Sequence, residues 1–113
     1  MHRQSIFDMK LSRVYPLLLA KLERKGRTKE ELDTVITWLT GYTADQVQAA
    51  MDETYGDFFR HAPAINPRAD LIRGTICGIR VEEIEDPLMK QIRQLDKLVD
   101  ELAKGRPMEK VLR

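Results

Sequence analysis

Signals for the beginnings and ends of helices constrain this chain of 113 residues more than any other feature of its sequence. Residues 28–31 (TKEE) and residues 43–46 (TADQ) both have the form of a capping box, in which the threonine hydroxyl accepts from a first-turn amide. Gly26 and Gly41 shortly precede these boxes, and glycine ends helices because it adopts the left-handed backbone conformation at low cost. Two capped starts and two glycine stops in so short a stretch predict a compact hairpin of helices.

Apolar side chains follow the helix starts at spacings of three and four residues, which is the pattern of one buried helix face. Ser12 can cap an earlier helix, and Asp86 begins a last long helix, from Leu88 to Ala103, that we expect to pack across the hairpin. In this last helix the apolar residues alternate in steps of four and three, as in a coiled-coil seam, over too few heptads for a free-standing zipper. The positions expected to be buried are Val14, Leu17, Leu18, Leu22, Leu32, Val35, Ile36, Leu39, Val47, Ala50, Met51, Leu88, Ile92, Leu95, Val99 and Leu102.

The segment from Leu71 to Ile84 admits two interpretations. Its isoleucines keep a helical period, and Gly74 and Gly78 would then share a face on which another helix can approach closely. Residues 75–84 are also rich in β-branched side chains, which favours a short hairpin. We favour the helix, although each glycine costs about 1 kcal/mol relative to alanine inside one.

Hydrophobic residues make up 42% of the chain and charged residues 33%, which is typical of a folded domain rather than of a disordered segment. The 19 basic and 18 acidic residues nearly cancel, whereas a dedicated nucleic-acid binder usually carries a clear basic excess. Nucleic acid is therefore not the expected partner.

Cys77 is the single cysteine, so no disulfide can form within the chain and a reducing compartment is expected. The first ten residues lack the apolar stretch of a signal peptide, and the longest apolar run, residues 16–20, is too short to cross a bilayer. These features predict a cytoplasmic protein with no membrane partner.

Together, the patterns predict an all-α fold: one compact helical domain over residues 1–113, a bundle of about five helices. A short irregular or hairpin segment around residues 75–84 is the one departure that we allow for. Residues 1–10 are expected to form a loosely ordered or docking N-terminal segment.

Few residues have the spacing that a catalytic, metal or cofactor site requires. Cys77 is a candidate nucleophile with His61 as its base, but a helical position between isoleucines favours a buried, inert thiol. The acidic run from Glu82 to Asp86 follows no calcium-loop spacing, and the chain has only two histidines, so no metal is expected. Because no phosphate-binding glycine loop or nucleophile motif occurs, we expect no cofactor and no enzyme activity.

Two further clusters have both a structural and a binding interpretation. Basic residues gather between Lys21 and Lys29, where cations suit a helix end and neighbouring glutamates dilute the positive field. Trp38 and Tyr42 flank a tight turn, and rings in such a place form a ligand platform or, more often, staple neighbouring helices together. The structural interpretation is favoured for both.

Several segments are shared with one known family. They are residues 14–16 (VYP), 26–28 (GRT), 38–42 (WLTGY), 76–89 (ICGIRVEEIEDPLM), 96–98 (DKL) and 101–105 (ELAKG). With these segments the chain resembles the small bacterial proteins grouped as domain of unknown function 2200, over nearly its whole length. The resemblance implies a bacterial cytoplasmic protein with a mainly helical fold, and it implies no activity and no catalytic residues.

The candidate binding surface combines the polar run and the aromatic turn. Arg80, Glu82 and Glu83 are more polar than a core stretch requires, and Trp38 and Tyr42 supply the aromatic side chains. Substitution of Arg80 and Glu83 by alanine tests this surface.

Three functional hypotheses follow. The leading one is a helical protein-interaction or adaptor module that meets a protein partner, or a second copy of itself, through the apolar seam and the two-glycine face. The second is weak nucleic-acid binding through the basic segment 21–29, which would depend steeply on salt. The third is a small enzyme that uses Cys77 or the acidic cluster 82–86.

Overall fold

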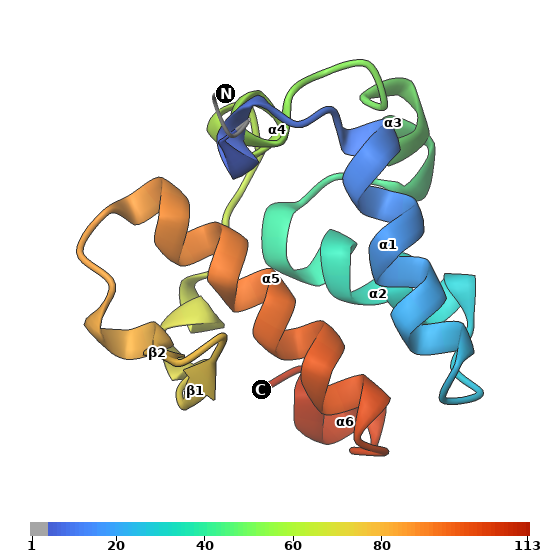
Figure 1. Cartoon of the computed structure of the whole chain (residues 1–113), viewed down its shortest axis with the longest axis vertical. Coiled ribbons are helices and arrows are strands. Elements are labelled where there is room, and N and C mark those ends of the chain that lie inside the picture. Colours follow the sequence, from blue (N-terminus) through green and yellow to red (C-terminus); the bar gives the residue numbers. More distant parts are fainter. Residues whose placement is uncertain (1–4) are drawn as a thin grey trace.

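The computed structural model describes residues 5–113. In that range the chain is mostly helical, with six α-helices, three short 3-10 helices (η) and one small antiparallel sheet of two strands (Figure 1). The sheet makes the fold predominantly α rather than all-α. In chain order the elements are η1 (Ile6–Asp8), α1 (Leu11–Glu23), α2 (Lys29–Thr40), α3 (Ala44–Ala49), α4 (Tyr55–Arg60), η2 (Pro67–Leu71), β1 (Thr75–Ile76), β2 (Ile79–Arg80), η3 (Val81–Glu83), α5 (Pro87–Ala103) and α6 (Met108–Val111).

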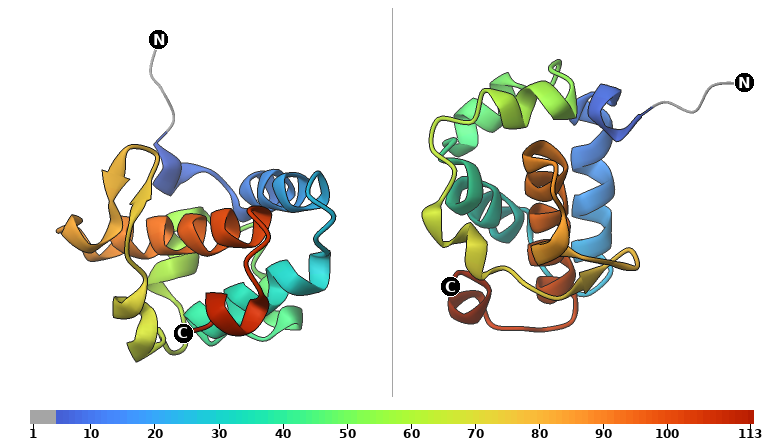
Figure 2. Two further views of the ribbon diagram at one scale, coloured as in Figure 1. Left: turned by 90° about the horizontal axis from the view of Figure 1, so that it is seen from below. Right: turned by 90° about the vertical axis from the view of Figure 1, so that its left-hand side faces the viewer.

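Helix α5 lies at the centre of the molecule, and α1, α2, α4, α6 and the two strands surround it (Figures 1 and 2). Asp86 caps this helix by accepting from the amide of Leu88 at 3.0 Å, and Pro87 takes the first position, where no amide is needed. The predicted seam is the buried face of α5, because Ile92, Leu95, Val99 and Leu102 are at most 1% exposed. The seam therefore packs against the protein's own helices.

Helices α2 and α3 begin at the two predicted capping boxes. Thr28 Oγ1 accepts from the amide of Glu31 at 3.2 Å, and the Glu31 carboxylate accepts from the amide of Thr28 at 3.1 Å. Thr43 and Gln46 make the same reciprocal pair at the start of α3. Gly41 ends α2 with a φ of +81°, as the sequence indicates. The two helices contact each other, and α5 packs against α2 as expected.

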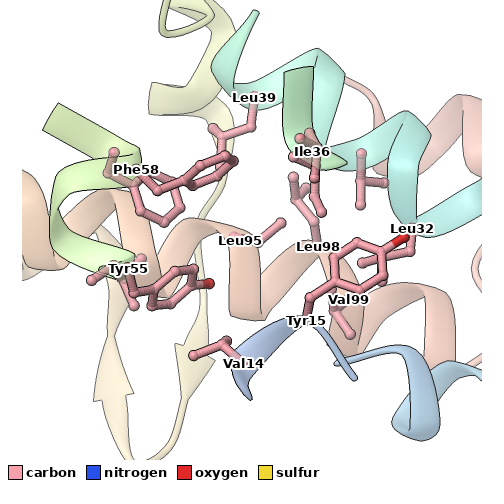
Figure 3. Packing of buried hydrophobic residues seen from close by; sticks show 14 of the residues in the cluster. Val14, Tyr15, Leu32, Ile36, Leu39, Tyr55, Phe58, Leu95, Leu98 and Val99 are labelled. Carbon is pink, nitrogen blue, oxygen red and sulfur yellow. The ribbon is translucent and has the colours of Figure 1, made fainter. Parts of the chain in front are cut away.

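Side chains from α1, α2, α4 and α5 meet in one core (Figure 3). Leu95 and Leu98 of α5 lie close to Ile36 and Leu39 of α2, and all four are at most 1% exposed. Burying a leucine or isoleucine side chain contributes about 1.5–3 kcal/mol, so this core is the main source of stability.

The first helix differs from the prediction at two positions. It begins at Leu11 rather than after Ser12, because the amides of Leu11 and Ser12 donate to the carbonyl oxygens of Glu53 and Met51, which replace a side-chain cap. Leu17 was expected in the core but is 63% exposed. The buried face of α1 follows residues 11, 14, 15 and 22, and at 100° per residue Leu17 lies about 120° from the centre of that face, outside the buried arc.

The segment predicted to continue as a helix is a β-hairpin instead. Thr75 pairs with Arg80 and Ile76 with Ile79, in antiparallel register. The two residues between the strands, Cys77 and Gly78, have φ values of +53° and +77°, as the tight I′ hairpin turn requires. The preferred helix was therefore wrong and the alternative hairpin was correct. No helix face carries Gly74 and Gly78, because both adopt positive φ.

The first described residues pack against the body of the molecule. Helix η1 contacts α4, and Lys10 forms an isolated antiparallel bridge with Thr54. The expectation of a loosely ordered or docking segment over residues 1–10 stays a prediction, and residues 1–4 lie outside the described residues. Among residues 5–113, no helix combines the length and the apolar character that crossing a membrane requires.

Candidate binding groove on helix α2

An open groove of about 520 Å³ runs along the outer side of α2, and most of its surface is apolar. Three parts of the chain form it: α2, the first residue of α3 and the residue next to the C-terminus. A concave apolar surface with a few polar groups at its edge is the usual form of a binding site. The lining residues are Glu30, Asp33, Thr34, Thr37, Trp38, Ala44 and Leu112.

The periodicity of α2 explains why the groove forms on this side. Leu32, Val35, Ile36 and Leu39 point into the core, so residues 30, 34, 37 and 38 share the outer side of the helix. Trp38 is half-buried, and its large ring forms the main aromatic surface of the groove.

Contacts near the C-terminus hold in place the wall of the groove that Leu112 forms. Arg113 donates to both carboxylate oxygens of Glu101 at 2.8 and 2.7 Å, and Glu101 is only 7% exposed. This bidentate pair ties the end of the chain to α5, and Leu112 is thereby held beside α2. At the other end of α2, the side-chain amide of Asn66 donates to the carbonyl oxygen of Trp38 at 3.1 Å.

Two carboxylates give the groove an acidic edge. Asp33 accepts from the Tyr15 hydroxyl at 2.5 Å and pairs with the Lys29 ammonium at 2.8 Å. Burial, together with the bond to Asp33, raises the pKa of Tyr15 to about 12, so the phenol remains a donor at neutral pH. Glu30 is exposed and pairs with no cation among residues 5–113. Glu30 is thus the groove's uncompensated negative charge.

The second aromatic residue of the predicted surface, Tyr42, lies in the core. It is 7% exposed, its ring stacks on Phe58 with 4.5 Å between centroids, and its hydroxyl donates to the carbonyl oxygen of Phe58 at 2.8 Å. Burial raises the pKa of Tyr42 above its ordinary value. Of the two rings, Tyr42 joins α4 to the end of α2 and Trp38 faces the groove.

The polar residues of the predicted surface lie elsewhere. Arg80, Glu82 and Glu83 belong to β2 and η3, and Figures 1 and 2 show α5 between this region and α2. None of the three lines the groove. The Glu82 carboxylate accepts from the amide of Gly74 at 3.2 and 3.4 Å, and this backbone bond lowers the pKa of Glu82. Glu82 thereby fastens the base of the hairpin.

The candidate catalytic groups do not converge. Cys77 was expected to be buried but is exposed, because it lies in the two-residue turn of the hairpin and not on the face of a helix. Its sulfur accepts from Arg93 Nη1 at 3.8 Å, whereas His61 contacts Glu53 at 2.9 Å. Within residues 5–113, no three histidine, cysteine, aspartate or glutamate side chains are grouped so that they could hold a metal ion.

Part of the basic segment lines a second cleft, of about 620 Å³, between the C-terminal ends of α1 and α5. Lys21 and Lys104 both pair with Asp100 there, at 3.3 and 3.0 Å. Burial acts to raise the pKa of Asp100, but the bonds from Lys104 and Lys21 outweigh it and the pKa falls below its ordinary value. Arg24 and Lys25 complete the cleft.

Sequence reasoning found Trp38 but missed the rest of the groove. The outer residues of α2 recur at helical spacing, and that stripe was a usable signal for Glu30, Thr34 and Thr37. No local pattern connects Leu112 with a helix that ends more than 70 residues earlier, because their proximity arises from tertiary packing.

The fold is thus that of a small helical protein built around one central helix, with an attached β-hairpin and an apolar groove. The chain belongs to the DUF2200 family, described as uncharacterized proteins conserved in bacteria, and the match covers residues 5–113.

The chain is also similar to a solved structure, the crystal structure of the uncharacterized protein SP1917. The two share 52% sequence identity with a TM-score of 0.92, over 98% of this chain and 93% of the other. No curated protein matches the chain. Neither the family description nor the name of the related protein states an activity, so no function is established by these matches.

Proposed function

We propose that this protein is a protein-interaction module and that the groove on α2 receives a segment of its partner. One observation carries the proposal: Trp38 presents a half-buried aromatic surface in an apolar groove of about 520 Å³. Tryptophan in a concave, largely apolar setting is the residue type most enriched among binding hot spots. The predicted seam and glycine face do not support the proposal, because the seam is buried and the glycines lie in turns.

The charge at the edge of the groove indicates the chemistry of the partner. Glu30 is unpaired among the described residues and supplies the negative charge of the edge, whereas the Asp33 carboxylate beside it is already paired with Lys29. A partner segment with an apolar side chain would fill the groove, and a neighbouring lysine or arginine would pair with the acidic edge. Two copies of this chain docked groove to groove would bring two acidic edges together, so we propose a different protein as the partner.

Selection of random peptides displayed on phage against the immobilised protein tests this proposal. We expect the selected peptides to share one large apolar residue next to basic residues. Trp38 is the only tryptophan, so its fluorescence should change when a selected peptide is titrated into the full chain. Binding should weaken as salt screens the acidic edge. A selection that yields acidic peptides, or peptides that leave the fluorescence unchanged, contradicts the proposal.

A matched pair of variants separates groove binding from general effects. Thr37 is exposed within the groove, so Thr37→Arg fills the groove and neutralises its edge without disturbing the core. Thr75 is exposed in β1, and Thr75→Arg makes the same chemical change outside the groove. We expect the first variant to lose at least tenfold in affinity, about 1.4 kcal/mol, and the second to bind normally. Equal binding by both would place the peptide elsewhere.

A second candidate function is weak binding of polyanions such as nucleic acid. Lys21, Arg24, Lys25 and Lys104 converge on one cleft from two helices, which favours phosphate groups. The Asp100 carboxylate between them reduces the positive field. Fluorescence polarisation with a labelled oligonucleotide at low salt distinguishes this function, and no binding there would dismiss it. For either function we propose a cytoplasmic location, which suits an exposed and unpaired Cys77.

A further inference from the structure

A small pocket of about 250 Å³ lies between η2 and the first turns of α5, and it shares no lining residue with the groove on α2. Ile65, Pro67, Ala69 and Pro87 supply its apolar walls. The polar groups that line it come mainly from α5 and include two glutamines one turn apart. Its volume is below the range of about 300–1,000 Å³ that is typical of drug-sized ligands, so an occupant would be small.

The two glutamines have different hydrogen-bonding states. Gln94 is 3% exposed, and its side-chain amide donates to the carbonyl oxygen of Ala69 at 3.2 Å, which holds η2 against α5. The amide oxygen of Gln91 is buried but accepts no hydrogen bond from residues 5–113. A buried acceptor without a donor is unfavourable, and a bound molecule with an N–H or O–H group would remove that penalty.

Two side chains of opposite charge line the same pocket. Lys90 is half-buried and Asp70 is exposed, and neither forms an ion pair with any residue in the described range. Charged groups that line a pocket without protein partners are suited to a ligand that carries the complementary charges. A ligand with an ammonium for Asp70 and a carboxylate for Lys90 is a zwitterion.

We propose that this pocket binds a free amino acid. The carboxylate of the ligand pairs with Lys90 and its ammonium with Asp70, and a rotation of the Gln91 side chain brings its buried, unpartnered oxygen within reach of an N–H of the ligand. The apolar walls receive a short side chain. The pocket is separate from the groove on α2, so this site does not depend on the proposed protein partner.

Thermal unfolding of the full chain, with each standard amino acid added at millimolar concentration, tests the proposal. A ligand that binds only the folded state raises the unfolding midpoint, and the rise grows with the ratio of ligand concentration to Kd. We expect one or a few small amino acids to raise the midpoint by a few degrees, and their N-acetyl and methyl-ester forms to do so much less. No shift with any amino acid, or an equal shift with the blocked forms, overturns the proposal.

Variants then place the ligand. Gln91→Leu keeps the bulk of the side chain but removes the acceptor, and Lys90→Gln removes the cation. Lys90→Gln should have a normal ligand-free midpoint and Gln91→Leu an equal or higher one, because it removes the unpartnered acceptor, and both should lose most of the shift. Lys110→Gln is the matched control, because Lys110 is exposed on α6 and does not line the pocket, and it should retain the shift. A shift that survives in Gln91→Leu and Lys90→Gln would mean that the amino acid binds elsewhere and would overturn the assignment.

Discussion

Helix α5 and the β-hairpin at residues 75–80 are neighbours in space but are specified in different ways. In α5 every local signal agrees: an aspartate cap, a proline in the first position and an apolar face that is buried from Ile92 to Leu102. The hairpin has only two residue pairs, and its sequence also fits a helical period. The structure of a segment can be predicted from its sequence when several local signals agree, and apolar spacing alone is not sufficient.

The hairpin also depends on α5 for its position. Ile76 packs into the core at 8% exposure, and Lys97 of α5 donates to the carbonyl oxygen of Thr75 at 3.2 Å. Isolated two-stranded hairpins are marginally stable in water, so packing against a helix supplies what the two pairs cannot. The stability of the molecule should therefore respond strongly to changes in α5 and weakly to changes in the hairpin.

The largest effect is expected from Leu95→Ala. Leu95 is 1% exposed at the centre of α5, and removing its side chain leaves a cavity that costs about 2–5 kcal/mol in the free energy of unfolding. Leu17→Ala is the matched control, because Leu17 is 63% exposed, and it should stay within about 0.5 kcal/mol. Chemical denaturation of both variants measures the difference. Similar losses would mean that α5 does not dominate the core.

Much of the fold could be predicted from sequence where side chains act locally. Thr28 and Thr43 bond to amides three residues away, so their role is visible in a short window. The hairpin could not be separated from a helix, because the deciding feature is a positive φ at Cys77, a residue type that rarely adopts it. Of the candidate surface, Trp38 lines the groove, whereas Tyr42 is buried and Arg80 lies beyond α5. Those outcomes depend on tertiary packing.

A smaller loss is expected from Gly78→Ala in the hairpin turn. A Cβ at this position meets nothing within 4 Å, so the cost comes only from the positive φ of +77°, and we expect about 1–2 kcal/mol. Gly105→Ala tests whether the turn itself matters, because Gly105 also has positive φ and open surroundings but follows α5. Equal losses in chemical denaturation would show a purely local backbone cost. A much larger loss for Gly78→Ala would show that hairpin and core unfold together.

Replacing Cys77 with asparagine should stabilise the protein slightly. Asparagine adopts positive φ more readily than cysteine and is favoured before glycine in I′ turns, so we expect a gain of about 0.5 kcal/mol. Cys77→Val should destabilise instead, because a β-branched residue is poorly suited to positive φ. Both values come from the same denaturation experiment. If asparagine destabilised the protein as valine does, the contact between the Cys77 sulfur and Arg93 would matter more than the backbone.

The smallest expected effects are on the pH dependence of stability. Here the hairpin and α5 should contribute with opposite signs. The amide of Gly74 lowers the pKa of Glu82 below its ordinary 4.5, so its stabilising contribution is present above 4.5 and is lost as the pH falls through the folded-state value. Burial raises the pKa of Asp96 on α5 above 3.8 despite its bond from Arg93. The contribution of Asp96 is therefore complete below 3.8 and is lost as the pH rises through its folded-state value.

An NMR titration follows the hairpin side of this difference directly. Because the Glu82 carboxylate accepts from the amide of Gly74, that amide resonance should shift with a midpoint below pH 4.5. Glu82→Gln should abolish the shift, whereas Glu83→Gln, which removes an exposed carboxylate from the next residue, should leave it intact. If the Gly74 resonance titrated at or above pH 4.5, Glu82 would not hold the base of the hairpin. The hairpin would then depend on α5 and its own turn alone.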